Sequence, residues 1–217
     1  QQPREFRDLI AINALIRPSV GDWNEYLERR TGKEWSTHEL RMPYMEETEG
    51  LLTYQEQYLL DCKTFAGWDL AFADKHVRKN KDIANDVELE TKFYYDATER
   101  GFSEPFVHQI WDDIVHAVSG GYGFNKSHST SYAKTSYKTA WLKYYYRKEF
   151  YASLMTQNGE NEDKIADIIA ECKKHNINIL PPDINISDDE FTPTNEGIRY
   201  RLTTIKNVGN SAIKSIR

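Results

Sequence analysis

Residues Tyr122–Phe150 read YGFNKSHSTSYAKTSYKTAWLKYYYRKEF, and their composition differs from that of the rest of the chain. The chain has 217 residues and a formal net charge of −6. Between Asp113 and Glu149, however, there is no acidic residue. The basic residues of this window are Lys126, Lys134, Lys138, Lys143, Arg147 and Lys148. Such a chain is not expected to coat nucleic acid over its whole surface, but it can hold an anion on one local face.

The length and composition indicate one large globular domain or slightly more, with 39% hydrophobic and 29% charged residues. No apolar run approaches the roughly 20 residues that cross a bilayer, and the N-terminus, QQPREFRDL, has no apolar signal core. We therefore expect a cytoplasmic protein without membrane contact. The missing initiator Met suggests an excised piece of a longer protein. Cys62 and Cys172 are expected to be free thiols, and no structural metal site is predicted.

Hydrophobic spacing predicts a mainly α-helical fold. Helices are expected at 4–17 (ended by Pro18), 51–68 (with Gly67 at its end), the start of 69–86, 87–100, 104–118, 130–155 and 163–175. Residues 19–50 are expected to be polar and turn-rich, with Trp23, Tyr26 and Trp35 as anchors. Gly120, Gly121 and Gly123 are predicted to form a flexible corner before the basic segment.

The C-terminal part follows another pattern. Asn158–Glu160 interrupts the helical spacing, Pro181–Pro182 favours an extended backbone, and Ile198–Leu202 alternates like a short strand. Residues 205–209 (IKNVG) resemble the turn of a helix-hairpin-helix, in which backbone amides contact DNA phosphates. We predict three regions: a helical domain at 1–157, a connector at 158–197, and the start of an incomplete helix-hairpin-helix unit at 198–217.

The basic segment has two predicted helical faces. Lys134 and Lys138 are four residues apart and share one face, whereas Tyr137, Trp141 and Tyr144 form another. We expect Trp141 and Tyr144 to pack this helix onto the body of the protein. The lysines have two readings: a solvated face, or a surface that neutralises phosphates. The absence of acids favours the second reading, because a nearby carboxylate would repel a phosphate backbone.

The head of the segment predicts an anion pocket. Residues 121–128 (GYGFNKSH) place a glycine corner before a helix start, where free amides, Lys126 and His128 can gather. His128 and Tyr132 are four residues apart, so both can face one ligand. A second basic cluster lies at 73–81 (ADKHVRKNK), where a solvated turn and phosphate binding are equally good readings. No carboxylate set for two-metal chemistry is present, and neither G-x-S-x-G nor H-E-x-x-H occurs.

The motif YGFNKSH-x-x-x-Y, followed by Y-x-T-A-x-L-K, resembles the bacterial replicative DNA polymerases of family C, the alpha subunits of DNA polymerase III, including phage versions. The resemblance is collinear over nearly the whole chain. Its further motifs are ALIRP at 14–18, ETEG at 47–50, YQEQ at 54–57, FAG at 65–67, AD at 73–74, ILPPDINIS at 179–187 and IKNVG at 205–209. The chain departs from the family pattern at Ser19, where glycine is usual, and in RKEF at 147–150, which lacks the usual proline.

The resemblance implies a fingers region that runs into a tandem helix-hairpin-helix. Nucleotide-binding positions are then implied at Asn125, Lys126, Ser127, His128 and Tyr132, with Arg78 and Lys79 near the family's LRRAMGKK stretch. The DNA-binding candidates are Lys134, Lys138, Lys143, Lys206 and Gly209. No catalytic residue is expected in this chain, with His128 as an assisting candidate. The metal-binding aspartates of the family belong to the palm, where Mg²⁺ is expected, and the palm is not in this chain.

These observations predict a fingers module of a DNA-directed DNA polymerase, which binds incoming dNTP and primer-template DNA and is inactive without its palm. Its expected partners are the palm of the parent chain or a separate palm subunit, with the sliding clamp as a further candidate. Two alternatives remain open at this point. One is a free-standing, non-catalytic module that binds DNA or the replisome. The other is an acidic helical scaffold whose basic patch contacts an acidic protein.

Overall fold

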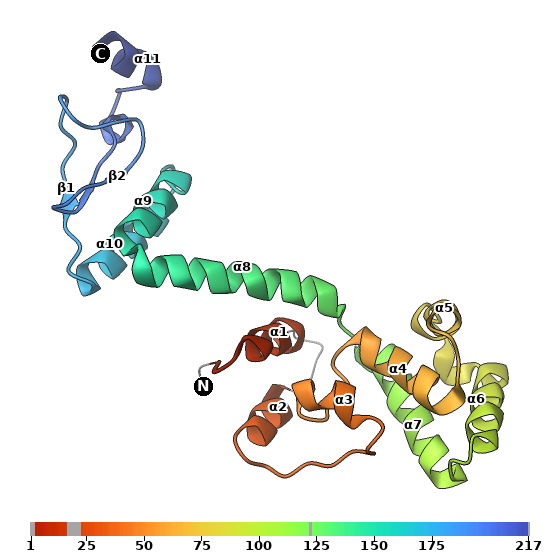
Figure 1. Ribbon diagram of the computed structural model, residues 1–217. Helices are drawn as coiled ribbons and strands as arrows, with labels where there is room; N and C mark the ends of the chain where they lie inside the picture. Colours follow the sequence, from red (N-terminus) through yellow and green to blue (C-terminus); the bar gives the residue numbers. More distant parts are fainter. Residues whose placement is uncertain (1–2, 17–22, 122, 217) are drawn as a thin grey trace. The chain divides into compact units, whose positions relative to one another are not determined.

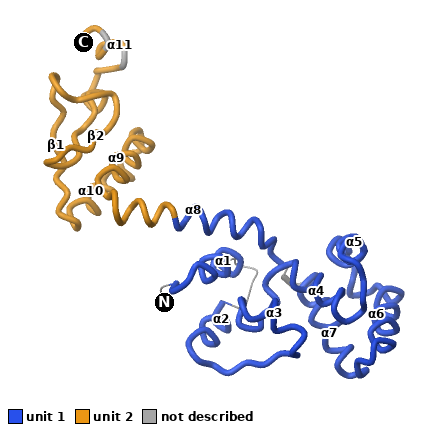
Figure 2. Tube along the Cα trace, in the orientation of Figure 1, with its two compact units in different colours: residues 1–137 blue, residues 138–217 orange. Residues whose placement is uncertain are grey.

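The computed structural model describes residues 3–16, 23–121 and 123–216, and these are mainly helical, which confirms the predicted fold class (Figure 1). The chain divides into two compact units, residues 1–137 and 138–217 (Figure 2). Each unit has its own hydrophobic core. The predicted end of the first helix at Pro18 lies outside the described residues. The domain boundaries predicted after residues 157 and 197 stay a prediction.

The first unit is built from helices joined by short turns. Its helices are α1 (Phe6–Leu15), α2 (Trp23–Arg30), α3 (Met42–Met45), α4 (Gln55–Ala66), α5 (Leu70–Ala73), α6 (Val87–Glu99), α7 (Glu104–His116) and the first part of α8 (Lys126–Tyr145). Single turns of 3-10 helix lie at Glu46–Thr48 and Ile83–Asn85, and π-helical turns at Asp74–Arg78 and Ala117–Gly121. The helices predicted near α1, α4, α6 and α7 are confirmed, but α2 and α3 lie in a segment that was expected to be turn-rich.

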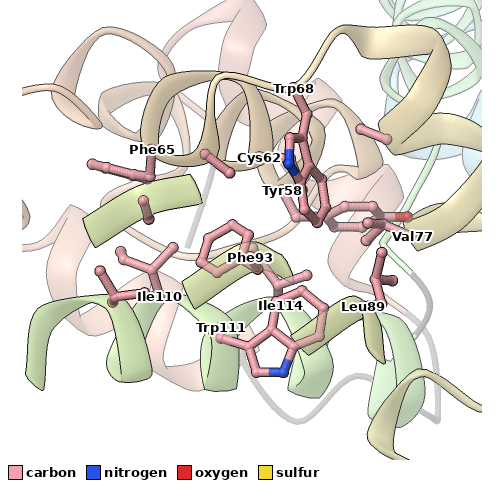
Figure 3. Packing of buried hydrophobic residues seen from close by; sticks show 14 of the residues in the cluster. Tyr58, Cys62, Phe65, Trp68, Val77, Leu89, Phe93, Ile110, Trp111 and Ile114 are labelled. Carbon is pink, nitrogen blue, oxygen red and sulfur yellow. The ribbon is translucent and has the colours of Figure 1, made fainter. Parts of the chain in front are cut away.

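The main core of this unit lies between α4, α6 and α7 (Figure 3). Its residues are spaced three and four apart on each helix, so each helix turns one apolar face inward. They include Tyr58, Cys62 and Phe65 of α4, Phe93 of α6, and Ile110, Trp111 and Ile114 of α7. Burying each large side chain stabilises the fold by roughly 1.5–3 kcal/mol. Gly67 ends α4 in the left-handed region, at φ 72°, which confirms the predicted cap.

A buried ionic network fastens the segment before α3 to this core. Arg41 binds both carboxylate oxygens of Asp61 on α4, at 2.8 and 3.0 Å, and donates to Asp113 on α7 at 2.8 Å. The Tyr44 hydroxyl donates to Asp61 at 2.7 Å. Burial raises the pKa of Asp61, and the hydrogen bonds from Arg41 and Tyr44 oppose that rise. Because Asp61 is fully buried, its charge depends on these partners.

The second unit combines the end of α8 with two helices and a small sheet. Its further helices are α9 (Arg147–Gln157), α10 (Glu162–Lys174) and α11 (Asn210–Ile216), with a 3-10 turn at Leu202–Thr204. The strands are β1 (Ile179–Leu180), β2 (Thr192–Pro193) and β3 (Ile198–Arg199), in the order β1-β3-β2. Strand β3 pairs in parallel with β1 (Ile179 opposite Ile198) and antiparallel with β2 (Thr192 opposite Arg199). The core contains Tyr151, Met155, Ile168, Cys172, Phe191 and Ile198.

Several sequence expectations for the elements are wrong in detail. The single helix predicted at 130–155 begins earlier, at Lys126, and is broken at Tyr146, whose φ of −125° and ψ of 53° are not helical. The strand predicted at 198–202 is only two residues long, because a 3-10 turn begins at Leu202. The helices predicted at 163–175 and at the start of 69–86 are confirmed by α10 and α5.

Two further findings concern the cysteines and membranes. Cys62 and Cys172 are both free, as expected, and both are buried. Burial raises the pKa of both thiols, that of Cys172 to about 11. Within the described residues, no helix has the length and apolar character needed to span a membrane.

Candidate functional site

The start of α8 is joined to the start of α4 through the backbone. The Phe124 amide donates to the Thr53 carbonyl at 2.9 Å, and the Gln55 amide donates to the Phe124 carbonyl at 3.0 Å. Gly123 permits this approach, because a Cβ there would lie 2.6 Å from a ring carbon of Tyr58 and 3.0 Å from the Gln55 nitrogen. The expected flexible corner is therefore wrong at Gly123, which is a close-packed position.

The Gln57 side chain holds the partner segment of this bridge. Its carbonyl oxygen accepts from the amides of Thr53 and Tyr54, both at 2.7 Å. Its amide nitrogen donates to the Tyr44 carbonyl at 2.8 Å and to the Thr48 hydroxyl at 2.7 Å. Gln57 is buried and uses all four of these bonds, so the extended chain that receives Phe124 is fixed.

The first turn of α8 already has acceptors for its amides. The Asn125 side-chain oxygen accepts from the His128 amide at 2.8 Å and from the Ser127 hydroxyl at 2.7 Å, as an N-cap residue does. The Lys126 amide donates to the two carboxylate oxygens of Glu56 at 3.1 and 3.2 Å. A carboxylate of the chain thus occupies the position where the sequence predicted a free pocket for an external anion.

The Lys126 ammonium is likewise paired. Its Nζ lies 2.6 Å from a carboxylate oxygen of Glu47 and 5.7 Å from the centre of the Tyr54 ring. Both side chains of the ion pair remain about one-third exposed, at 37% for Lys126 and 29% for Glu47. An incoming anion can therefore reach this lysine, but it has to compete with Glu47.

His128 and Tyr132 lie against each other, as their spacing predicted. Their ring centres are 4.6 Å apart, and the His128 ring is 5.6 Å from that of Phe124. Both residues are exposed. Together they present an imidazole and a phenol to solvent, two and six residues after Lys126, where they can donate hydrogen bonds to a ligand.

Small residues on the other side of α8 pack it onto α1. The buried Ser129 hydroxyl donates to the Ile10 carbonyl at 2.5 Å, Ala133 is fully buried, and the rings of Tyr137 and Phe6 meet edge to face at 6.1 Å. Sequence reasoning singled out neither Ser129 nor Ala133, although small residues repeated four apart are a signal for close helix approach. Their contacts leave the exposed side of the helix start available to a ligand.

The second predicted basic cluster is folded onto itself. Arg78 and Lys79 both pair with Asp74, Lys79 at 3.0 Å. Hydrogen bonds from Arg78 and Lys79 lower the pKa of Asp74 to about 2. Both basic residues lie at the end of the π-helical turn, Arg78 half-buried and Lys79 exposed.

The predicted DNA-binding residues are exposed and belong to both units. Lys134 lies on the first-unit part of α8, and Lys138 and Lys143 lie on the second-unit part. Among the described residues, no carboxylate is within ion-pair distance of these three lysines, and Lys143 lies 5.6 Å above the Tyr151 ring. Lys206 and Gly209 are exposed in the turn before α11, where a Cβ on Gly209 would meet no described atom within 4 Å.

The expectation that Trp141 and Tyr144 pack α8 onto the body is wrong. Trp141 is 43% exposed and Tyr144 is 70% exposed. On α8 only Ser129 and Ala133 are buried among the described side chains. The rings of Tyr137, Trp141 and Tyr144 share one face of α8, as their spacing predicted, but Trp141 and Tyr144 do not belong to a core cluster of the described residues.

No metal centre can be built from the part of the chain that the structure describes. It contains no group of three or more His, Cys, Asp or Glu residues placed to hold a metal ion.

Two family models match this chain. Residues 1–101 match the model of the bacterial DNA polymerase III alpha subunit finger domain, and residues 176–217 match a helix-hairpin-helix motif. The chain is 38% identical to the DNA polymerase III subunit alpha of Saccharopolyspora erythraea, 37% to that of Chlamydia muridarum and 36% to that of Campylobacter jejuni. Each alignment covers 99% of this chain but only 18–19% of the relative, so the chain spans about a fifth of the length of these proteins.

Proposed function

Because the chain belongs to the family of bacterial DNA polymerase III alpha subunits and matches its finger domain, we propose that it is the fingers module of a DNA-directed DNA polymerase. In this role it binds the incoming dNTP and the primer-template DNA, while another part of the polymerase supplies the chemistry of nucleotidyl transfer. The observation that carries the proposal is the start of α8. There the partly exposed ammonium of Lys126 and the exposed rings of His128 and Tyr132 lie within the first two turns of a helix whose start is anchored by a backbone bridge.

Lys126 is the residue that we assign to the triphosphate. Its ion pair with Glu47 is partly exposed, and such pairs contribute only about 0–1 kcal/mol. A triphosphate carries several negative charges and can therefore displace a single carboxylate from the ammonium. The backbone bridge between Phe124 and Tyr54 keeps the Lys126 backbone in place during this exchange.

Asn125, Ser127, His128 and Tyr132 complete the proposed nucleotide site. Asn125 caps the helix start, the Ser127 hydroxyl donates to the Asn125 side-chain oxygen, and the exposed His128 and Tyr132 reach the ligand. The imidazole has two roles open to it: a hydrogen bond to the triphosphate, or protonation of the departing pyrophosphate. Arg78 and Lys79 can join the site only if a phosphate draws them away from Asp74.

Lys134, Lys138 and Lys143 are proposed to contact the DNA backbone. Each is exposed on α8 and, among the described residues, has no carboxylate within ion-pair distance, so each can neutralise a phosphate. Lys206 and the backbone at Gly209 are proposed to add contacts from the helix-hairpin-helix motif, where an open glycine lets a phosphate approach the main chain. These contacts read charge and shape and carry no sequence preference.

The proposed function also requires a metal ion and partner domains that the described residues do not provide. Polymerases of this kind use divalent metal such as Mg²⁺ in the catalytic domain, and we assign this metal to the palm. The palm, in the parent protein or as a separate subunit, is thus an obligatory partner, and a sliding clamp is a further one. The chain alone is proposed to be inactive in nucleotide transfer.

Lys126→Ala, made in a polymerase that contains this segment, tests the proposal. We expect kcat/KM for dNTP to fall at least about tenfold, which corresponds to about 1.4 kcal/mol. Lys92→Ala is the matched control, because Lys92 is also a partly exposed lysine paired with one carboxylate, that of Asp96. Kinetics unchanged by Lys126→Ala, or lowered equally by Lys92→Ala, would contradict the proposed role.

A further inference from the structure

The second unit carries a group of exposed rings that the proposed function does not use. They are Trp141, Tyr144, Tyr145 and Tyr146, at the end of α8 and the break before α9, and we call them the aromatic cluster. Their exposed fractions are 43, 70, 63 and 50%. Isolated exposed rings are common, but four in a run of six residues form a contiguous apolar surface, which usually marks a binding site.

The rings of the cluster contact one another. The Trp141 ring lies 4.9 Å from that of Tyr145 and 5.5 Å from that of Tyr146, with tilts of 42° and 43°. Tyr144 and Tyr145 meet edge to face at 4.8 Å. These contacts limit the motion of the rings, so a flat ligand that stacks on them loses little side-chain entropy.

Along the chain the charges of the cluster are basic, although Glu149 and Glu196 line the hollow beside Tyr145 and Tyr146. Lys138, Lys143, Arg147 and Lys148 lie in residues 138–148, and the next acid is Glu149. Lys148 is used inside the unit, where its Nζ donates to the Thr194 carbonyl at 2.7 Å. Lys138 is exposed, Lys143 lies 5.6 Å from the Tyr151 ring, and Arg147 donates to the Lys143 carbonyl at 3.3 Å. Three cations thus flank the rings, and among the described residues none of them is within ion-pair distance of a carboxylate, although the charge of Lys143 contributes to the lowered pKa of Glu171.

This combination fits a ligand that offers flat rings and negative charges in alternation. The core of a protein-protein interface is usually depleted of charge, whereas here the cations alternate with the rings along the chain. The faces of paired bases are covered by stacking within a duplex. Unpaired nucleotides expose them, and their phosphates follow at a spacing that flanking Lys and Arg side chains can reach.

We propose that the aromatic cluster binds the unpaired template strand of DNA. Bases stack on Trp141 and the neighbouring tyrosines, and Lys138, Lys143 and Arg147 neutralise the phosphates between them. The inference rests on the proposed function for the identity of the polymer, and it adds a single-strand site to the duplex and nucleotide contacts assigned above.

Binding of fluorescently labelled oligo-deoxythymidylate to the 217-residue chain, measured by anisotropy, tests the site. Stacking contributes about 1–3 kcal/mol per base, so Trp141→Ala should weaken binding at least about fivefold. Trp141→Phe keeps a stacking ring and should stay within about threefold of the unchanged chain. Tyr95→Ala is the matched control, because Tyr95 is 64% exposed on α6 and lies outside the basic segment. It should leave the affinity unchanged.

A second readout separates stacking from charge. Lys138→Ala should reduce the salt dependence of oligonucleotide binding, whereas Trp141→Ala should lower the affinity and leave that slope unchanged. Quenching of tryptophan fluorescence by the oligonucleotide should be weaker in Trp141→Phe. Equal affinity of Trp141→Ala and the unchanged chain for oligo-deoxythymidylate would overturn the proposal. Binding of poly-glutamate as tight as that of the oligonucleotide would also overturn it and would indicate an acidic protein partner.

The same titration with a blunt duplex distinguishes this inference from the proposed function. If the duplex binds and the single strand does not, the aromatic cluster is not a template site, while the fingers assignment stands. If the single strand binds through Trp141 but Lys126→Ala leaves dNTP kinetics unchanged, the cluster site stands and the nucleotide assignment fails.

Discussion

Helices α7 and α8 follow each other along the chain, yet they use their large apolar residues in opposite ways. In α7, Val107, Ile110, Trp111 and Ile114 are each at most 2% exposed. In α8, Tyr132, Tyr137 and Trp141 are 43–58% exposed, and only the small Ser129 and Ala133 are buried among its described side chains. Helix α7 packs into the core through its large side chains, whereas α8 leaves its aromatic side chains exposed to solvent.

The angular positions of these residues do not by themselves explain the difference. An α-helix turns about 100° per residue, so the spacing of three, one and three in α7 gathers its large side chains on one face. On α8 the rings at 137, 141, 144 and 145 also lie within an arc of about 100°, with Tyr132 apart, yet all five are exposed. None of them belongs to a core cluster of the described residues. Helix α8 therefore supports exposed side chains, whereas α7 builds a core.

The sharpest test of this comparison replaces one tryptophan on each helix. Trp111→Ala should destabilise the first unit by about 3–5 kcal/mol, because it removes a fully packed ring from the core. Trp141→Ala should cost no more than about 1 kcal/mol, the worth of its contacts with Tyr145 and Tyr146. Urea unfolding followed by circular dichroism measures both. Similar losses in the two variants would show that α8 is packed after all.

The buried ionic network of the first unit gives the next largest effect. Asp61→Asn leaves the buried Arg41 with Asp113 alone, and an undercompensated buried charge typically costs about 3 kcal/mol. Glu25→Gln is the control, because Glu25 pairs with Arg29 and Lys33 near the surface, where the loss should be about 0–1 kcal/mol. The midpoint of urea unfolding reports both changes. If Asp61→Asn were as mild as Glu25→Gln, Arg41 would not depend on Asp61.

The core of α4, α6 and α7 could be predicted from the sequence because one physical rule decides it. Apolar residues at helical spacing, with Gly67 as a stop, fixed α4, α6 and α7 to within a few residues at their ends, apart from the later start of α4. Helix α2 was missed, because WNEYLERR is polar and buries only Tyr26. The break at Tyr146 was missed for a related reason: a run of three tyrosines continues the composition of the helix on both sides.

The candidate site could be predicted only where it is local in sequence. The spacing of His128 and Tyr132 predicted that they share a face, and their rings are in contact. Glu47 and Glu56 lie 79 and 70 residues away from Lys126, and yet both bind it. The basic segment contains no acidic residue in its sequence, but in the folded chain the carboxylates of Glu47 and Glu56 lie beside its start. A count of charges in a window cannot detect partners that the fold brings in from elsewhere.

Acid conditions should weaken the part of the first unit on which the start of α8 rests. Burial disfavours the charged form of Asp8, but hydrogen bonds from Arg30 and from the Arg4 and Glu5 amides outweigh it and lower its pKa from 3.8 to about 2. Because the pKa of Asp8 is lowered on folding, its charge stabilises the fold at pH values above the pKa of the unfolded state. This stabilisation is lost as the pH falls from about 4 to about 2. Asp8→Asn should cost about 2 kcal/mol at neutral pH.

Urea unfolding at a series of pH values measures this contribution. The difference in stability between the unchanged chain and Asp8→Asn should shrink as the pH falls through that range, because protonated Asp8 and Asn carry the same charge. A difference that stays constant from neutral pH to pH 2 would show that the charge of Asp8 is not what stabilises the contact between α1 and α2.

The smallest expected effect concerns the start of α8, where the exposed helix meets the packed unit. Glu47→Gln removes the carboxylate that pairs with Lys126, so an external anion no longer has to displace it. A partly exposed ion pair is worth about 0.6 kcal/mol, which corresponds to about a threefold gain in affinity for inorganic triphosphate. Lys126→Ala should lose this binding, and Glu28→Gln, which removes a surface partner of Lys33, should not alter it. Calorimetric titration with triphosphate measures all three. If Glu47→Gln bound no more tightly while Lys126→Ala lost binding, the anion would reach Lys126 without displacing Glu47.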